Sequence, residues 1–218
     1  MPSSITPKGR KHGSSFTTTL DKISAVGKKW ARCRKCSFSK YRKNVVMFKG
    51  NADSGVVLIG EAPGKEEDRI GIPFVGSAGK VLDGGLKLAH ITLNDCGVVN
   101  IMACRPCLVY DGPNDTPDRD ETRNCLPRLE TLLNILKPSI VVLLGRIAQD
   151  AVLGKRPEFS RLHYRGVTIC LCLHPAALIY DVKRRDEWKK FWREFRSLRK
   201  LWGVRRDVVW SLPLKRRG

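Results

Sequence analysis

Glu61 stands at the end of an apolar run, in a stretch covering residues 58–79 that reads LIGEAPGKEEDRIGIPFVGSAG. Residues 56–59 are aliphatic and mostly β-branched, which predicts a buried parallel strand, and the glycines after it let backbone N–H groups approach a ligand closely. Ligands of open α/β sheets bind at that carboxyl edge. GEAPG alone would also fit a tight strand-to-helix turn with a solvated Glu.

Two further polar residues follow predicted strands. Asn100 ends the strand GVVN, and His174 directly follows an apolar strand and precedes Pro175. A lone His at a strand end is more often a hydrogen-bonded structural group, but a strand-end Glu in the same sheet favours function. Three polar strand ends at one edge predict a pocket made of Glu61, Asn100 and His174.

Four cysteines could converge on a metal. Cys33 and Cys36 form a C-x2-C turn, and Cys104 and Cys125 flank a loop rich in Pro, Asp and Asn. Four thiolates suit tetrahedral zinc or an iron–sulfur cluster. On spacing alone Cys107 could replace Cys104. The others, in or beside apolar stretches, are expected to be buried structural thiols: Cys96, Cys170 and Cys172.

Composition favours a nucleic-acid partner. The chain has 218 residues, enough for one domain with a real core, and a formal net charge of +20 from 41 Lys+Arg and 21 Asp+Glu. Such a field attracts polyanions, and no basic amphipathic segment with a clean apolar face suggests a membrane surface instead. No run of 18 apolar residues and no secretory signal is recognised, so the eight cysteines are expected in a reducing interior.

Strands alternate with helices along the chain, which predicts an α/β fold: a single domain of three layers, α/β/α, with a mostly parallel central sheet. The expected strands are residues 45–48, 56–59, 97–102, 140–144 and 167–173. The expected helices are residues 20–30, 80–89, 122–136, 146–153 and 184–201. We expect a flexible basic arm over residues 1–18, the domain over residues 19–203 and a basic tail over residues 204–218.

The last predicted helix carries large apolar residues at helical spacing: Trp188, Phe191, Trp192, Phe195 and Leu198. They share one stripe, so we expect them in the core and not on a nucleic-acid platform.

The order and spacing of these motifs resemble a known family. GEAPGKEEDRIGIPFVGSAG, NIMACRP, the C-x2-C ahead of them and HPAALI near the end are similar to the iron–sulfur uracil-DNA glycosylases, the fourth family of the uracil-DNA glycosylase superfamily. The resemblance covers about residues 20 to 200. It implies removal of uracil from DNA, single-stranded or duplex, and a [4Fe–4S] cluster regarded as structural, held by Cys33, Cys36, Cys104 and Cys125.

The resemblance also implies roles in the pocket. Glu61 matches the carboxylate that orients the attacking water and stabilises positive charge on the sugar. Phe74 matches the aromatic stacked on the flipped base, Asn100 the amide that reads the uracil edge, and His174 the donor to uracil O2. The remaining implied uracil-binding positions are Gly60, Ala62 and Glu67.

Contacts to DNA are expected around the same motifs, at Gly76, Ser77, Lys183 and Arg184. Leu178 and Ile179 are candidates to fill the vacated base stack, although ordinary packing at a helix start explains them equally well.

The sequence departs from the family pattern in two places. The loop between Cys104 and Asn114 is a few residues longer and contains Cys107, which leaves the ligand there open. Ile179 and Tyr180 stand where Leu-Arg is common, which puts a phosphate contact in question, and residues 183–185 could substitute. No His lies between residues 90 and 163, which argues against the covalent DNA adduct that a related branch forms.

We therefore expect a monofunctional glycosylase that leaves an abasic site, because no Lys is evident at the pocket motifs to form a Schiff base. The expected protein is a monomer, cytoplasmic or nucleoid-associated, with its charged tails open to replication or repair proteins. The alternatives are a DNA-binding or scaffold protein that keeps this fold without catalysis and a zinc-ribbon-like binder.

Overall fold

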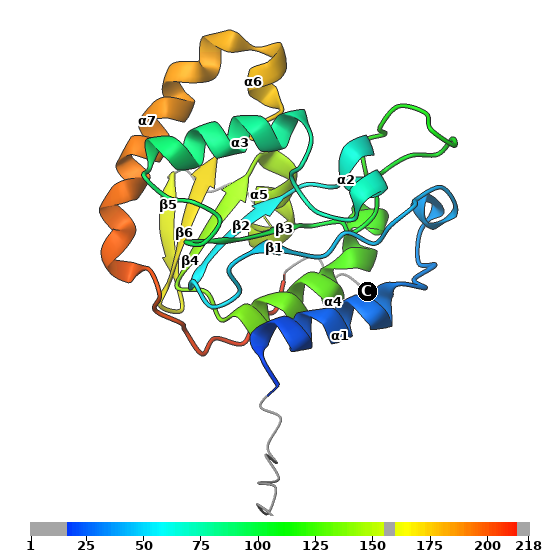
Figure 1. The fold of residues 1–218 in the computed structure, drawn as a ribbon, viewed down its shortest axis with the longest axis horizontal. Coiled ribbons are helices and arrows are strands. Elements are labelled where there is room, and N and C mark those ends of the chain that lie inside the picture. Colours follow the sequence, from blue (N-terminus) through cyan, green and yellow to red (C-terminus); the bar gives the residue numbers. More distant parts are fainter. Residues whose placement is uncertain (1–16, 155–159, 213–218) are drawn as a thin grey trace, which may run out of the picture.

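Six strands form one sheet in the described part of the computed structural model, residues 17–154 and 160–212. Their order across the sheet is β1-β3-β2-β4-β6-β5, and the four central strands are parallel while β1 and β5 pair antiparallel at the two edges (Figure 1). The strands are β1 (Lys49–Gly50), β2 (Val56–Gly60), β3 (Gly97–Asn100), β4 (Ile140–Leu144), β5 (Arg161–Tyr164) and β6 (Val167–Cys172).

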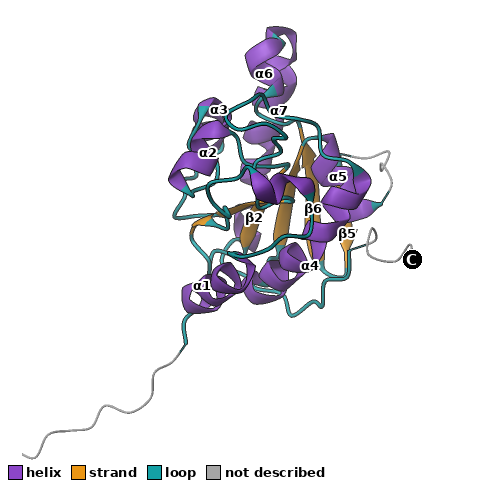
Figure 2. Cartoon of the chain, turned by 90° about the vertical axis from the view of Figure 1, so that its right-hand side faces the viewer, coloured by secondary structure: helices purple, strands orange, loops and turns teal. Residues whose placement is uncertain are grey.

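Helices cover both faces of the sheet, so the predicted three-layer α/β/α fold is confirmed. One face packs on α1 (Thr19–Trp30), α4 (Arg119–Leu136) and α5 (Arg146–Leu153), of which α1 and α4 lie side by side in Figure 2. The other packs on α3 (Ser77–Leu88), α6 (Ala177–Tyr180) and α7 (Arg185–Phe195). The short helix α2 (Lys65–Ile70) follows β2 at the carboxyl edge of the sheet.

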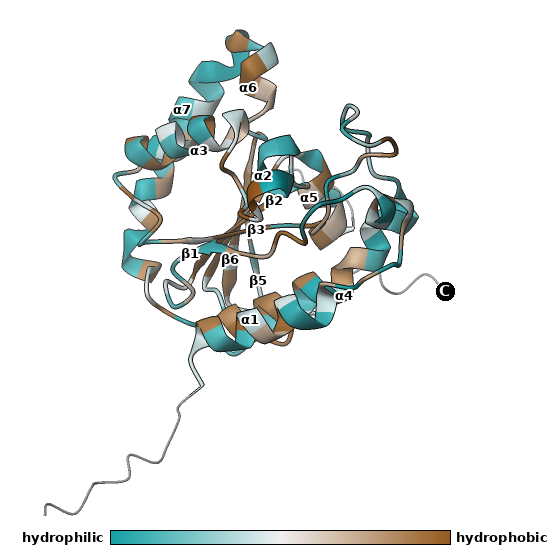
Figure 3. Ribbon diagram, turned by 45° about the vertical axis from the view of Figure 1, so that its right-hand side comes forward, coloured by the Kyte–Doolittle hydropathy of each residue, from teal (hydrophilic) through white to brown (hydrophobic). Residues whose placement is uncertain are grey.

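The pleat of the central strands explains the two cores. Val57 and Ile59 of β2 lie in the apolar cluster with α1 and α4, whereas Val56 and Leu58 point to the cluster with α3 and α7. Both faces of a parallel strand are therefore buried, which is why β2 reads as an unbroken aliphatic run. Figure 3 shows apolar residues, in brown, recurring along α1 and α4, and their buried members pack in the cluster with β2.

The aromatic stripe of α7 lies mostly in the core, as predicted. Trp188, Trp192, Phe195 and Leu198 are buried and Phe191 is half-buried. Trp188 and Trp192 meet edge to face with ring centroids 5.4 Å apart. The regular helix stops at Phe195, however, and residues Arg196–Leu201 form a 3-10 turn instead of continuing the predicted helix.

The predicted strand over residues 45–48 is wrong. The strand begins at Lys49 and has two residues, because only Lys49 and Gly50 pair with Val98 and Gly97 of β3. Before that point Val46 N–H donates to the Ala103 carbonyl at 2.7 Å, and the Phe48 ring packs against Gly97 of β3. The run of four consecutive apolar residues indicated burial of their side chains and not hydrogen bonding to a neighbouring strand.

Two elements had no signal in the sequence. Strand β5 is a mostly exposed edge strand with the polar pattern RLHY, and the left-handed pair Arg165 and Gly166 joins it to β6 in a tight hairpin. Helix α2 has six residues, too few for a helical period to be visible.

The segment expected to be a tail is partly built into the domain. Trp210 and Leu212 are buried against the α4 side, and their backbone N–H groups donate to Asn134 Oδ1 at 2.9 Å and Glu130 Oε1 at 2.7 Å. The division at residue 204 therefore does not mark the end of the packed structure. Residues 213–218 of the predicted tail and residues 1–16 of the predicted arm lie outside the described residues.

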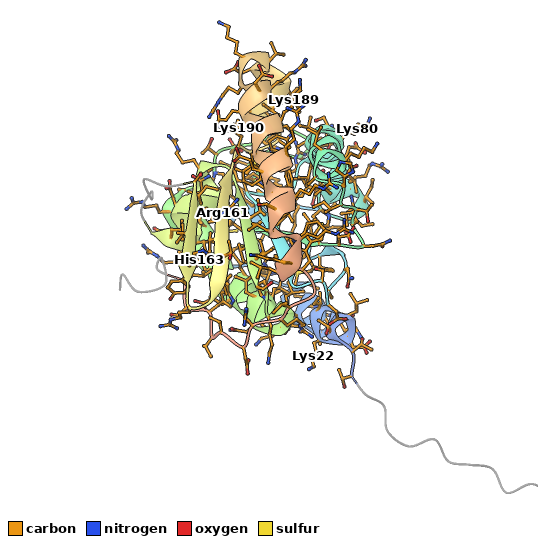
Figure 4. The ribbon with its side chains drawn as sticks, turned by 90° about the vertical axis from the view of Figure 1, so that its left-hand side faces the viewer. Lys22, Lys80, Arg161, His163, Lys189 and Lys190 are labelled. Atoms are coloured by element: carbon orange, nitrogen blue, oxygen red, sulfur yellow. The ribbon has the colours of Figure 1, made fainter. Side chains whose placement is uncertain are left out.

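Basic side chains project from several elements at once. Figure 4 shows Lys80 on α3 and Lys189 and Lys190 on α7 pointing outward near the top of the view. Lys22 lies at the opposite end of the domain. Within the described ranges, no helix combines the length and the apolar character that crossing a membrane requires.

Candidate active site

The carboxyl ends of the parallel strands surround a cavity of about 380 Å³. Glu61 follows β2, Asn100 ends β3 and His174 lies two residues after β6, and all three line this cavity. Gly60 and Asn100 are register partners across β2 and β3, which brings the first two groups side by side. The pocket predicted from three polar strand ends is therefore present in the structure.

Glu61 is held by its backbone while its side chain stays available. The Glu61 carbonyl accepts a hydrogen bond from Met102 N–H at 2.9 Å, which continues the β2–β3 pairing one residue past the sheet. The carboxyl group is half-buried, and this burial raises its pKa. Water-poor surroundings make a carboxylate a stronger partner for positive charge nearby.

Asn100 presents an unused acceptor to the cavity. Its side chain is 2% exposed, and Oδ1 has no hydrogen-bond partner among the described residues. Its backbone carbonyl is fixed from behind, since Arg128 Nη2 donates to the carbonyls of Asn100 and Ile101 at 2.5 and 2.7 Å. A buried acceptor left open in this way is costly unless a ligand satisfies it.

His174 has a defined tautomer and an unused donor. Ala176 N–H donates to Nδ1 at 3.2 Å, so Nδ1 is the acceptor nitrogen and Nε2 of the neutral ring carries the proton. Nε2 is buried and meets no partner in the described structure. Burial lowers the pKa of His174 to about 4, so the ring is neutral near pH 7 and Nε2–H donates into the cavity.

The buried His174 predicts a pH dependence of stability. Its pKa is about 4 when folded and 6.5 as the ordinary value, so the unfolded chain binds the proton first. The free energy of unfolding should therefore fall as the pH falls from 6.5 to 4, by up to about 1.4 kcal/mol per pH unit. Urea denaturation of wild type and His174→Gln across this range measures it. If the free energy of unfolding depended on pH in the same way in both proteins, His174 would not be the group that titrates.

Phe74 forms a wall of the cavity in a strained backbone conformation. Its φ is 53°, unusual for a bulky residue, and its ring centroid lies 6.2 Å from that of His174. Lys49 Nζ donates to the Phe74 carbonyl at 3.1 Å and holds the turn. Gly60 lies directly behind, where an added Cβ would collide with the Phe74 ring and with Asn100 Oδ1. Only glycine therefore leaves room for both side chains.

Glu67 ties the two glycine-rich turns together. Oε2 accepts from Gly64 N–H at 3.0 Å, and Oε1 accepts from Val75 and Gly76 N–H at 2.9 and 2.7 Å. The residue borders the cavity and is 7% exposed, but these three bonds occupy its oxygens. Glu67 is therefore a positioning residue, because its hydrogen bonds fix the backbone of the turn that carries Phe74.

Replacing Glu67 by Gln should loosen this turn. One oxygen of the carboxylate becomes an NH2 group, which cannot accept from the backbone N–H it faces, so we expect a loss of about 1–3 kcal/mol in the free energy of unfolding. The KM for substrate should rise more than kcat falls, because Phe74 is displaced while Glu61 stays. Denaturation and steady-state kinetics measure both. A pure kcat effect would show instead that Glu67 acts in the reaction.

Most site residues named from the sequence do meet here. The cavity is lined by these members of that set: Glu61, Ala62, Glu67, Phe74, Gly76, Ser77, Asn100, His174 and Ile179. Gly60 lies just behind the wall. Leu178 is 6% exposed and packs in the core beneath α3 and α7, and only Ile179 of that pair, 41% exposed, stands at the cavity.

Lys183 and Arg184 lie away from the cavity walls. Both are exposed, and Arg184 pairs with Glu187 at 3.0 Å. Sequence reasoning in turn missed the wall formed by the connection from β3 to α4, which contributes Pro106, Asn114 and Asp115. In the sequence this connection was marked only by its length and by its content of Pro, Asn and Asp.

The four cysteines of the predicted ligand set come together on the α1–α4 face. Cys104 and Cys125 are each 4% exposed in the core cluster there, and Cys33 and Cys36 pack against it. Burial raises the pKa of the Cys104 thiol to about 12, and the nearby Cys125, Cys36 and Cys33 add to this. Cys107 instead points to the Val109 carbonyl, inside its own loop.

This donor set fits an anionic iron–thiolate group. Arg128 is fully buried beside it, and Nε and Nη1 of its guanidinium have no hydrogen-bond partner among the described residues. Burial lowers the pKa of Arg128, whereas thiolates at Cys125, Cys104 and Cys33 raise it. In the described ranges, no three His, Cys, Asp or Glu side chains are grouped for a single metal ion. In an iron–sulfur cluster each thiolate binds a different iron, so the four sulfur atoms lie farther apart than ligands of a single metal ion do.

Comparison with known proteins places this geometry in a family. Residues 47–196 match the uracil DNA glycosylase superfamily. The type-4 uracil-DNA glycosylase of Pyrobaculum aerophilum is 38% identical over 72% of this chain and 85% of its own length. Those of Thermotoga maritima and Archaeoglobus fulgidus are 36% and 29% identical, over 74% and 88% of this chain and 85% and 99% of theirs. The chain belongs to the uracil DNA glycosylase superfamily and has type-4 enzymes as its relatives.

Proposed function

We propose that this protein removes uracil from DNA by hydrolysing its N-glycosidic bond and leaves an abasic site. The observation that carries the proposal is the pair of buried, unpaired atoms in one cavity, the acceptor Asn100 Oδ1 and the donor His174 Nε2. Family membership supports the same conclusion.

The two atoms suit uracil and oppose cytosine. Uracil has a donor at N3–H and acceptors at O2 and O4, so Asn100 Oδ1 can accept from N3–H while His174 Nε2–H donates to O2. Cytosine has a lone pair at N3, which would face Asn100 Oδ1 and leave both acceptors unsatisfied. A site built for one hydrogen-bond pattern rejects the other strongly. Phe74 supplies an aromatic face for the base.

Charge separation in the reaction explains why a carboxylate and a neutral histidine share the pocket. Cleavage leaves positive charge on the sugar and negative charge on the departing uracil. Glu61 stabilises the first and orients the attacking water, and His174 Nε2–H stabilises the second at O2. These groups act at opposite ends of one transition state, and no covalent enzyme intermediate is required.

The target base must leave the helix to reach the cavity, which costs a few kcal/mol. Gly76 and Ser77 begin the 12-residue helix α3 at the cavity rim, where the positive end of the helix suits a backbone phosphate beside the flipped nucleotide. Lys80 one turn further and the net charge of +20 favour the same polyanion. We expect single-stranded and mismatched uracil to react fastest, since unstacking costs least there.

We further propose that Cys33, Cys36, Cys104 and Cys125 hold a [4Fe–4S] cluster. When bound, the cluster would join the end of α1, the turn after it, the connection from β3 and helix α4 into one unit. Its role is structural, because these cysteines line no part of the cavity that contains Glu61 and His174.

The first test is uracil release from a single-stranded oligonucleotide by anaerobically purified protein, read as strand breakage after alkali. A cytosine-containing oligonucleotide and the Glu61→Ala variant serve as controls. Breakage confined to uracil and lost in the variant establishes the activity. Tight DNA binding without breakage, by protein with its iron intact, would refute it and favour a binding or scaffold protein.

A further inference from the structure

The connection from β3 to α4 holds three consecutive apolar residues out in the solvent. Leu108, Val109 and Tyr110 are 46%, 65% and 68% exposed. We call residues 108–110 the apolar tip. Single exposed apolar residues are ordinary, but a run of three at the end of a projecting loop is costly unless it meets a partner.

The loop is braced so that the tip stays in place. Arg105 is 6% exposed, and its guanidinium donates to Asn114 Oδ1 at 2.7 Å and to the Gly112 carbonyl. Leu108 N–H donates to Asp115 Oδ2 at 3.0 Å. These bonds close the loop at its base. The tip is therefore presented in a fixed shape, which lowers the entropy cost of binding.

Cations stand beside the tip. Asp111, the next residue, lies 3.5 Å from Lys43 Nζ and 3.7 Å from Lys65 Nζ, and Lys43 Nζ also lies 5.4 Å from the centre of the Tyr110 ring. The tip thus combines apolar side chains with positive charge at its flank. This composition suits nucleic acid, which offers flat apolar bases joined by phosphates.

The base of this loop is a wall of the active-site cavity. Pro106, Asn114 and Asp115 line it together with Glu61, and the exposed Ile179 and Tyr180 of α6 line it as well. Figure 1 shows the loop, in green, and α6 both rising beyond the carboxyl edge of the sheet, and Figure 3 shows apolar colour on the loop. The tip therefore projects from a loop whose base borders the cavity.

We propose that the apolar tip packs against the bases next to the flipped uracil in the bound strand. This inference rests on the proposed function. Flipping leaves the neighbouring bases with open faces, and each face covered by an aromatic or apolar side chain contributes about 1–3 kcal/mol to binding. Covering them at the cavity mouth also opposes the return of uracil into the stack.

The test uses the double variant Leu108→Ser/Val109→Ser in the Glu61→Gln protein, which we expect to bind uracil DNA as wild type does and to convert it slowly. The matched control is Leu20→Ser/Val209→Ser, since Leu20 and Val209 are 55% and 73% exposed and lie in α1 and in the segment after Gly203. Affinity for a fluorescein-labelled, uracil-containing single strand is measured from low to high salt. We expect about tenfold weaker binding for the tip variant at every salt concentration and wild-type binding for the control.

The salt series distinguishes protein contacts to bases from protein contacts to phosphates. Loss of a phosphate contact flattens the slope of log K against log salt, whereas loss of a base contact lowers affinity with the slope unchanged. A second reporter is 2-aminopurine placed beside the uracil, whose fluorescence should change on binding to the parent protein and less with the tip variant. If the tip variant binds DNA with unchanged affinity, or with a flattened salt slope, the inference is wrong. Unchanged affinity would favour a protein as the partner of the tip.

Uracil release by the otherwise wild-type protein separates the two hypotheses. If uracil is released but the tip variant binds like the control, the inference about the tip fails and the proposed function stands. If no uracil is released, the proposed function itself has failed.

Discussion

Glu61→Gln should lower the single-turnover rate of uracil release by about 10²–10³-fold while DNA binding stays within about twofold of wild type. The substitution keeps the size of the side chain and removes its negative charge, so it removes stabilisation that exists only while the sugar carries positive charge. The uracil contacts of Asn100 and His174 are untouched, which is why affinity should hold. Rapid-quench kinetics with excess enzyme and a binding titration measure the two quantities.

The pH profile gives the same substitution a second readout. Burial raises the pKa of Glu61, so wild-type activity should begin to fall below neutrality at a higher pH than an ordinary Glu, with its pKa of 4.5, would allow. The residual activity of Glu61→Gln should fall little over the same acidic pH range. Asp115→Asn, at the same cavity but paired with Leu108 N–H, is the matched control and should keep both rate and profile. A Glu61→Gln enzyme with a wild-type profile would exclude Glu61 as the titrating group.

Arg128→Met should destabilise the protein by about 3–5 kcal/mol and release iron from it. Arg128 is fully buried, donates to the carbonyls of Asn100 and Ile101, and lies beside the cysteines of the α1–α4 face. Methionine fills similar volume but leaves two buried carbonyls unpaired and removes a buried cation from beside the sulfur ligands. Anaerobic urea denaturation and the iron content per chain are the measurements.

Arg128→Lys separates charge from geometry. Lysine keeps the cation, but its side chain is shorter and its ammonium does not reach the position of Nη2 that serves both carbonyls. Iron should therefore be retained while the KM for uracil DNA rises through a displaced Asn100. An Arg128→Met protein with full iron and wild-type stability would show that the guanidinium balances no charge there.

The parts of the fold carried by continuous apolar runs could be predicted from the sequence. Strand Ile140–Leu144 and helix Arg146–Leu153 have the predicted bounds, because both faces of the strand are buried and Gly145 and Gly154 stop the elements. The polar strand ends Glu61, Asn100 and His174 share a cavity for the same reason, since parallel strands bring their carboxyl ends to one edge.

What could not be predicted depends on contacts distant in sequence. The basic segment after Gly203 looked like a tail, yet Trp210 finds cover and a hydrogen bond on α4, which no local pattern reveals. The edge strand β5 has a polar pattern because little of it is covered. Glu67 looked like a pocket residue, and only the structure shows that backbone N–H groups of two separate turns occupy its oxygens.

The bracing of the loop by Arg105 has an evolutionary consequence. Arg105 and the bond from Asp115 N–H to the Pro106 carbonyl at 2.7 Å close the loop at its base. The length and chemistry of residues 107–111 can therefore change while the backbone that carries the catalytic groups stays in place. Lengthening a closed loop costs little entropy. Selection can therefore vary this segment and so change which DNA is preferred, and a protein engineer could graft other sequences there without rebuilding the pocket.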